Sequence, residues 1–303
     1  MPCDTAKPLV AILGAVPADV KAALLPDFHL MEPEQWVDLL PEARAKIDRA
    51  LTSAVGGAAR ELVEKLTGLR RIASVGAGVD RFDQPWLEAR GVALCPTPEV
   101  MTEDTAEYAV ALVFALLRNV VSNDRFVRSG AWTQSRAPLG LRISGAQVGI
   151  VGLGRIGSRI AEKLAALGCS VAYTGRTKKD VKWRFEPDAL RLAAQSDVVI
   201  LSCAGGEATR HLADIGLLEA LGPQSYLVNV SRGSVVDEAA LIAALEEGRI
   251  AGAALDVFEN EPMPDPRFLQ LENCILSPHA AVFTRQNRVD LIARIAELLS
   301  FDD

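Results

Sequence analysis

Apolar runs of strand length alternate with amphipathic stretches along almost the whole chain. Strand-like runs occupy residues 9–13, 29–31, 50–55, 71–75 and 92–95, and later 148–151, 170–173, 198–201, 226–230, 251–257 and 274–277. Helical patterns separate them, for example at residues 17–24, 58–66, 85–89 and 158–167. Strands that alternate with helices predict an α/β protein with parallel sheets, because parallel neighbours need a crossover connection.

The alternation breaks once, near residue 97. Pro96, Thr97 and Pro98 interrupt it before a long helix expected at 105–118, where Asp104 and Glu107 have the spacing of a capping box. A chain of 303 residues exceeds a typical single domain, so two domains are expected. We place the crossing between them at this break.

The last stretch of the chain is helical, and no strand follows it. Arg288, Ile292, Ile295 and Leu299 fall on one helical stripe. Such a helix must pack on a structure already built, and we expect it to return to the first domain. The predicted organisation is a discontinuous domain of residues 1–98 and 284–303, a second domain of residues 99–283, and a cleft between them.

A glycine-rich turn follows the strand at residues 148–151. Gly152, Gly154 and Gly157 form a GxGxxG pattern that opens a helix, and a second strand follows at 170–173. In a βαβ unit these glycines allow a sharp turn, a close approach of a pyrophosphate to the backbone, and tight helix packing, with the helix N-terminus facing the phosphates. This context predicts a dinucleotide-binding domain rather than a turn without a ligand.

The end of that second strand bears on the choice of cofactor. Folds that prefer NAD place an acidic residue roughly 20 residues after the first glycine, where it binds the ribose 2′-hydroxyl. This chain instead has Thr174, Gly175, Arg176, Thr177 and Lys178. We predict that these residues bind a 2′-phosphate, with Arg176 as the main contact, and that the cofactor is NADPH. The alternative is a solvated basic loop made of Lys178, Lys179, Lys182 and Arg184.

Composition and charge argue against several classes of protein. The formal net charge of −7 disfavours a nucleic-acid partner, which needs a basic face. No apolar run reaches the roughly 18 residues of a membrane span and no secretory pattern opens the chain, so we expect a cytoplasmic protein with no membrane partner. Scattered cysteines without CxxC spacing argue against a disulfide framework and a metal site. They are Cys3, Cys95, Cys169, Cys203 and Cys274.

Ligands of open α/β sheets bind beyond the carboxyl ends of strands, so the loops after strands are the candidate sites. In the loop at 74–80, successive N–H groups can point at a carboxylate because the residues are small, although a tight turn before a helix fits equally well. These residues are Val75, Gly76, Ala77 and Gly78.

Arg232 directly follows the apolar strand at 226–230 and precedes a glycine. Its planar guanidinium can bind a carboxylate and a carbonyl oxygen through two parallel donors. A structural salt bridge is the alternative for this residue.

Histidine occurs at three positions only, His29, His211 and His279. His29 lies in an apolar run and His211 in a helix-like stretch, so both are predicted to be structural. His279 follows a strand and the turn-fixing Pro278, which suits a positioned proton donor. Glu261 is the candidate carboxylate to pair with His279 and hold its tautomer.

Over nearly its whole length the chain resembles the D-isomer-specific 2-hydroxyacid dehydrogenases. The glycine fingerprint of that family matches GLGRIG at residues 152–157, and its substrate-carboxylate loop matches SVGAGVD at residues 74–80. Its catalytic arginine falls on Arg232 in VNVSRGSVVDE, its catalytic glutamate on Glu261 in LDVFENEP, and its catalytic histidine on His279 in SPHAA. Its nicotinamide-contacting aspartate matches Asp256. The resemblance also implies cofactor contacts from Thr105, Leu153, Arg155, Ile156, Ser202, Cys203, Val230 and Ser231.

The resemblance implies two Rossmann-like or flavodoxin-like domains, a homodimer, and reduction of a small 2-keto acid. The sequence YTGRTKK at the strand end is similar to the NADPH-preferring glyoxylate and hydroxypyruvate reductases, with NADH as the other cofactor to consider. Arg232 would then clamp the carboxylate and His279, paired with Glu261, would protonate the alkoxide, while the N–H groups of Ala77 and Gly78 hold the carboxylate's other side. Two alternatives stay open, namely an NAD-linked relative for a larger 2-keto acid and a non-catalytic dinucleotide-sensing module like the related transcriptional corepressors.

Overall fold

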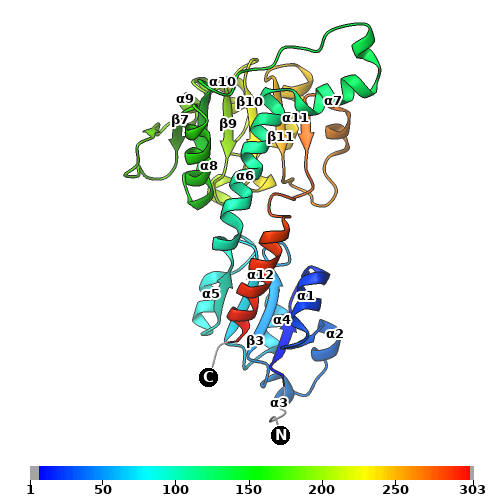
Figure 1. Ribbon diagram of the computed structural model, residues 1–303. Coiled ribbons are helices and arrows are strands. Elements are labelled where there is room, and N and C mark those ends of the chain that lie inside the picture. Colours follow the sequence, from blue (N-terminus) through cyan, green and yellow to red (C-terminus); the bar gives the residue numbers. More distant parts are fainter. Residues whose placement is uncertain (1–6, 301–303) are drawn as a thin grey trace. The chain divides into compact units, whose positions relative to one another are not determined.

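The computed structural model describes residues 7–300 and comprises two compact units (Figure 1). Unit 1 is Met1–Met101 together with Phe283–Asp303, and unit 2 is Thr102–Val282. Each unit is built on one sheet in which all strand pairs are parallel, with flanking helices. The α/β class predicted from the alternating pattern is therefore confirmed.

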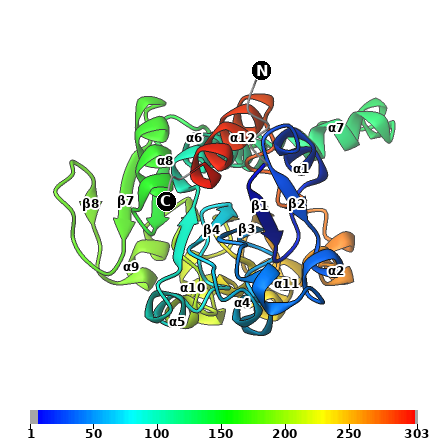
Figure 2. The same cartoon turned by 90° about the horizontal axis from the view of Figure 1, so that it is seen from below.

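The sheet of unit 1 has five strands in the order β2-β1-β3-β4-β5. They are β1 (Leu9–Ile12), β2 (His29–Met31), β3 (Arg49–Ser53), β4 (Arg71–Val75) and β5 (Ala93–Pro96). The helices that connect them are α1 (Ala18–Leu24), α2 (Pro33–Trp36), α3 (Pro41–Arg44), α4 (Arg60–Lys65) and α5 (Gln84–Ala89), most of which Figure 2 shows around the strands. Trp36, Ile47 and Ile72 are fully buried in the core of this unit.

The C-terminal helix α12 (Arg285–Leu299) packs on unit 1, against β4 and α1. Its last turn has four carbonyl groups without helical partners. Arg49 satisfies one of them by donating to the carbonyl oxygen of Leu299 at 2.6 Å, and Arg71 donates to that of Leu298 at 3.0 Å. Side chains of two neighbouring strands thus anchor the end of this helix.

The buried face of α12 differs from the predicted stripe. Arg288 and Ile292 are partly exposed, whereas the buried residues are Asn287, Leu291, Ile295, Leu298 and Leu299. The polar Asn287 lies inside because its amide donates to the carbonyl oxygen of Val100 at 2.6 Å. This hydrogen bond to a distant part of the chain places a polar residue on the buried face of the helix. A hydrophobic pattern does not reveal such a residue.

The sheet of unit 2 has seven strands in the order β12-β11-β10-β9-β6-β7-β8. They are β6 (Gln147–Val151), β7 (Ser170–Thr174), β8 (Arg184–Phe185), β9 (Val198–Leu201), β10 (Tyr226–Asn229), β11 (Gly252–Leu255) and β12 (Cys274–Leu276). The chain proceeds in one direction from β6 to β8 and in the other from β9 to β12. The carboxyl ends of β6 and β9 therefore form the switch point at which doubly wound folds bind their ligands.

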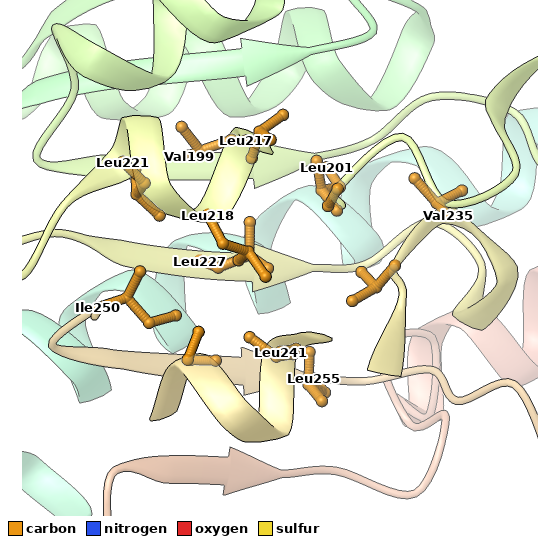
Figure 3. Close-up of a cluster of buried hydrophobic side chains, with 14 of the residues drawn as sticks. Val199, Leu201, Leu217, Leu218, Leu221, Leu227, Val235, Leu241, Ile250 and Leu255 are labelled. Atoms are coloured by element: carbon orange, nitrogen blue, oxygen red, sulfur yellow. The ribbon is translucent and has the colours of Figure 1, made fainter. Parts of the chain in front are cut away.

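Two hydrophobic clusters cover the two faces of this sheet. On one face lie α6 (Pro98–Leu117) and α8 (Arg155–Ala166), and on the other α9 (Ala189–Ala194), α10 (Ile215–Leu221) and α11 (Glu238–Glu246). Figure 3 shows Leu217, Leu218 and Leu221 of α10 beside Val199 and Leu227 of the strands. Burial on both faces explains why the strands read as continuous apolar runs.

Helix α6 begins earlier than the sequence predicted. It starts at Pro98 instead of residue 105, so Asp104 and Glu107 lie inside the helix and do not form an N-terminal capping box. Proline fits the first turn of a helix because its φ is already helical and its missing N–H would have no partner there. Pro98 is therefore the first residue of this helix, whereas the sequence predicted that it lies before the helix.

The remaining helix of unit 2, α7 (Val120–Arg128), was not expected from the sequence. Asn119, with a left-handed φ of +52°, separates it from α6. No single helix among residues 7–300 is long and apolar enough to span a membrane, and α6 and α7 satisfy that criterion only as a pair, across a bend of 54°. The cysteines within these residues, at positions 95, 169, 203 and 274, are free, and Cys3 lies outside them.

Candidate active site

The glycine turn after β6 has the geometry of a phosphate cradle. Gly152 has a φ of +94°, and a Cβ atom there would lie 2.6 Å from the Cα atom of Cys203. At Gly157 a Cβ atom would lie 2.2 Å from the carbonyl oxygen of Gly152, so only glycine lets the helix pack this closely. Gly154 has open space around it and caps α8 without a side-chain hydrogen bond. The first N–H groups of α8 therefore remain available to an anion.

The other residues expected around this cradle differ in how far they are exposed to solvent. Arg155 is exposed, Ile156, Ser202 and Cys203 are partly exposed, and Leu153 is buried in the core, where only its backbone could meet a ligand. Ser202 donates its hydroxyl to the carbonyl oxygen of Gly152 at 2.9 Å, which fastens the end of β9 to the turn. Thr105 is a buried residue of α6.

The turn after β7 presents basic side chains. Arg176 and Lys178 are exposed, as are Gly175 and Thr177, and neither basic residue forms an ion pair with any residue between 7 and 300. Thr174 is an exception among the expected contacts, because it is buried and its hydroxyl donates to the carbonyl oxygen of Pro187 at 3.4 Å. Its contact with a 2′-phosphate stays a prediction.

Arg232 is held in a loop that Asn229 organises. The fully buried amide of Asn229 donates to the carbonyl oxygen of Arg232 at 2.9 Å and accepts from the N–H of Ser231 at 3.0 Å and its hydroxyl at 2.7 Å. Ser231 and Val230 are buried, and their cofactor contacts stay a prediction. The Arg232 guanidinium donates to the carbonyl oxygen of Ser231 at 2.8 Å.

Gly205, in the loop after β9, makes room for Arg232. A Cβ atom at this position would lie 2.6 Å from Cγ and 3.2 Å from Cβ of Arg232. The absence of a side chain at Gly205 therefore sets the path of the arginine. No sequence motif marks this glycine.

Glu261 and His279 form the pair that the sequence predicted. Nδ1 of His279 donates to Oε2 of Glu261 at 2.8 Å, and the N–H of Phe258 donates to Oε1 at 3.0 Å. Both side chains are about one quarter to one third exposed. Because Nδ1 is engaged, Nε2 is the ring nitrogen that can face a ligand.

The environment of Glu261 keeps it ionised. Burial acts to raise its pKa, but the hydrogen bond and charge of His279, the N–H of Phe258 and the charge of Arg232 together bring that pKa below its ordinary value. An ionised carboxylate beside the imidazole stabilises the protonated ring. The pair can therefore orient the His279 ring for proton transfer to a ligand atom.

Asp256 holds the loop that follows β12, and its contact with a nicotinamide stays a prediction. It is buried, and its Oδ1 accepts from the hydroxyl of Ser277 and from the N–H of Ala280 at 2.8 Å, while Oδ2 accepts from the N–H of Ala281 at 3.1 Å. The loop between Ser277 and Ala281 carries His279, whose φ of +54° is left-handed. Asp256 therefore fixes the backbone on which His279 is mounted.

The candidate carboxylate loop of unit 1 follows β4. Gly76 has a φ of +114°, and its N–H donates to the hydroxyl of Thr97 at 3.0 Å. That amide is therefore not available to a carboxylate, contrary to expectation, whereas Val75, Ala77 and Gly78 are partly exposed. The carboxylate-binding role of the loop stays a prediction.

Of the two other histidines, His29 lies in a strand as predicted, whereas His211 does not lie in the predicted helix-like stretch. His29 is exposed at the start of β2. His211 does not lie in a helix but precedes α10 with a left-handed φ of +49°, and its Nε2 bonds to Oε1 of Glu259 at 2.6 Å. Among residues 7–300, no group of three or more histidine, cysteine, aspartate or glutamate side chains could hold a metal ion.

Comparison with known proteins identifies the family. Residues 110–281, more than half of the chain, match the model of the NAD binding domain of D-isomer specific 2-hydroxyacid dehydrogenases. The chain belongs to this family. The resemblance stated from the GLGRIG, VNVSRG, LDVFENEP and SPHAA motifs is thereby confirmed.

Several members of the dehydrogenase family are similar over most of the chain. Glyoxylate/hydroxypyruvate reductase A of Arabidopsis thaliana is 42% identical over 264 residues, which cover 86% of this chain and 84% of the plant protein. The 2-ketogluconate reductase of Gluconobacter oxydans (strain 621H) is 38% identical over 296 residues, or 97% and 95% of the two chains. Among solved structures, the NADPH-dependent glyoxylate/hydroxypyruvate reductase of Sinorhizobium meliloti, in complex with NADP and malonate, superposes with a TM-score of 0.87 and 33% identity. That match covers 96% of this chain and 92% of the other.

Proposed function

We propose that this dehydrogenase reduces a small 2-keto acid, glyoxylate or hydroxypyruvate, to the D-2-hydroxy acid, with NADPH as the preferred cofactor. The observation that carries the proposal is the Glu261–His279 pair with Arg232 nearby, at the carboxyl ends of β10 to β12. These residue types supply a proton donor and a carboxylate-binding cation, which are the groups that reduction of a 2-keto acid needs.

The cradle after β6 fits a nicotinamide dinucleotide. Gly152, Gly154 and Gly157 leave the backbone and the N-terminus of α8 open to a pyrophosphate. When bound, the reduced nicotinamide supplies the hydride that reduces the keto carbon. The exposed Arg176 and Lys178 favour a 2′-phosphate, because both present a positive charge without an internal ion pair.

The chain's own residues then divide the remaining tasks. Arg232 binds the carboxylate of the keto acid and polarises the neighbouring carbonyl group. His279 donates its Nε2 proton to the keto oxygen as negative charge develops there. Glu261 holds the imidazole in the tautomer and orientation that this transfer needs, and its charge stabilises the protonated ring before the transfer.

A homodimer is part of the proposal. Helix α7 lies outside the sheet of unit 2 in both Figure 1 and Figure 2. On α7 and the segment that follows it, large apolar side chains are exposed, by 54% to 67% of their surface at three positions and by 99% at Leu139. This apolar arm consists of Val120, Val127, Trp132, Leu139 and Leu141. An exposed apolar patch of this kind is typical of a protein interface, and a second copy of the chain is the proposed occupant.

The activity test is a panel of initial rates. NADPH and NADH oxidation are each measured with glyoxylate, hydroxypyruvate, pyruvate and a bulkier 2-keto acid. Fast oxidation of NADPH with the two small acids supports the proposal. Activity with NADH alone on the bulkier acid would favour the NAD-linked relative, and binding of cofactor without turnover would favour the sensing module.

A further inference from the structure

His211 lies in a segment that pairs with the loop of Arg232. The N–H of His211 donates to the carbonyl oxygen of Ser234 at 2.8 Å, and the N–H of Ala213 donates to that of Val235 at 2.9 Å. Ala213 and Val236 form a parallel bridge. The backbone around His211 is therefore bound to the segment that begins at Arg232.

The ring of His211 reaches a different segment, the turn that carries Glu261. Its Nε2 bonds to Oε1 of Glu259 at 2.6 Å, two residues before Glu261. The N–H of Glu259 in turn donates to Oε1 of Glu238, the first residue of α11, at 2.8 Å. His211 thus joins, through its backbone and its ring, the two segments on which Arg232 and Glu261 are mounted.

The same two segments are in direct contact at Gly233. A Cβ atom at Gly233 would lie 1.9 Å from the carbonyl carbon of Phe258 and 2.2 Å from the nitrogen of Glu259. Packing this close fixes the distance between the two segments, which continue from the paired strands β10 and β11. The bond between His211 and Glu259 is a second point of attachment.

Acidic side chains surround this second attachment. Burial, together with the nearby Glu259, Asp265 and Glu261, raises the pKa of the buried Glu238, although the N–H of Glu259 opposes that rise. Glu259 therefore stands among like charges, which repel it from its position. The imidazole of His211 faces Glu259 as a donor, with both side chains about one third exposed or less.

We propose that His211 is a positioning residue that, through Glu259, locks the Arg232 segment against the turn of Glu261. The proposal rests on the proposed function, since it assigns His211 an effect on Arg232 and Glu261. It assigns no contact between His211 and the substrate.

The test compares His211→Ala with His211→Gln. Both substitutions place an ordinary side chain at the left-handed φ of position 211, so the backbone strain is matched between them. Glutamine keeps an N–H donor that can reach Glu259, and alanine does not. The single variant Glu259→Ala and the double variant His211→Ala/Glu259→Ala complete a double-mutant cycle, and the exposed His29→Ala in unit 1 is the control.

Because His211→Ala removes a charge-assisted hydrogen bond, we expect it to lower kcat/KM for glyoxylate by roughly tenfold. The Kd of NADPH, measured by fluorescence, should stay unchanged. His211→Gln should recover most of the activity, the double variant should lose no more than His211→Ala alone, and His29→Ala should match the unmodified protein. If His211→Ala does not fold, Glu259→Ala, which removes the acceptor of the same bond and keeps His211 itself, takes its place in the comparison.

Three results would overturn the proposal: full activity in His211→Ala, an equal loss in His211→Gln, or additive losses in the double variant. His279→Asn and Arg232→Lys are measured alongside. Full activity in these two variants means that the proposed function itself is wrong. Loss in both, together with full activity in His211→Ala, means that only the positioning role is wrong.

Discussion

Glu261 accepts a hydrogen bond from Nδ1 of His279 at 2.8 Å, although 18 residues separate the two in the chain. The bond depends on three supports, namely the N–H of Phe258 on the other carboxylate oxygen, the charge of Arg232, and the Asp256 carboxylate that holds the His279 loop. His279, Glu261 and Arg232 therefore form one connected structure in unit 2.

The pH dependence of stability should reflect this pair. The pKa of Glu261 lies below its ordinary value of 4.5 in the folded protein, so at pH values between the two the unfolded chain binds more protons than the folded one. The pair therefore stabilises the fold fully above that ordinary value and loses its contribution as the pH falls through the lower folded value.

Glu261→Gln should accordingly lower the free energy of unfolding by about 1 kcal/mol at pH 7, because it removes a charge-assisted bond between partly exposed side chains. Urea unfolding of both proteins from pH 7 down to pH 3 measures this. The difference should shrink toward acid pH. A difference that stays constant over the range would show that another interaction is responsible.

Gly205→Ala should impair catalysis without unfolding the protein. The new Cβ atom would lie 2.6 Å from Cγ of Arg232, and the flexible arginine would move aside. We expect kcat/KM to fall by roughly tenfold, the size of effect that loss of a hydrogen bond to a charged group produces.

Gly216→Ala is the matched control for this prediction. It lies on α10 of the same unit, where a Cβ atom would meet only Oδ1 of Asp214 at 3.3 Å. Equal kinetics in both variants and the unmodified protein would refute the role given to Gly205.

Arg176→Ala should affect NADPH more than NADH. If Arg176 binds the 2′-phosphate, its removal raises the KM of NADPH by roughly tenfold, as expected for a charge-assisted bond, and leaves that of NADH unchanged. Lys182→Ala, whose ammonium lies over the Trp183 ring in the same basic loop, is the control. An unchanged KM for NADPH in Arg176→Ala would support the solvated loop instead.

Leu139→Asp should shift the protein toward the monomer. Leu139 is 99% exposed, and a carboxylate buried in a subunit interface without a partner is strongly unfavourable. Light scattering coupled to size exclusion measures the mass of the variant, with Leu40→Asp in unit 1 as the exposed control. A monomeric unmodified protein, or a dimer that tolerates Leu139→Asp, would contradict the proposed interface.

The sequence predicted those parts of the site that lie next to strand ends. Arg232 and His279 are each recognisable because a charged or titratable residue directly follows an apolar run, and Glu261 because it lies in the loop after such a run. The glycine turn is equally visible, because its spacing and its strand–helix context are local.

Contacts between distant segments could not be predicted in the same way. The space left by Gly205 and the bond from His211 to Glu259 both depend on how loops meet in three dimensions. His211 has a left-handed backbone and bonds to distant segments, so the prediction that it lies in a helix-like stretch was wrong. The burial of the Asp256 carboxylate could not be predicted either, because a motif identifies the residue but not its surroundings.

The most direct test is the rate of NADPH oxidation with glyoxylate, compared between the unmodified protein and His279→Asn. Loss of a general acid predicts a fall in kcat of about a hundredfold or more, with the Kd of NADPH unchanged. Rapid turnover by the unmodified protein and its loss in the variant would support His279 as the proton donor of a 2-keto acid reductase. Equal turnover in the two proteins, or none in the unmodified one, would contradict it.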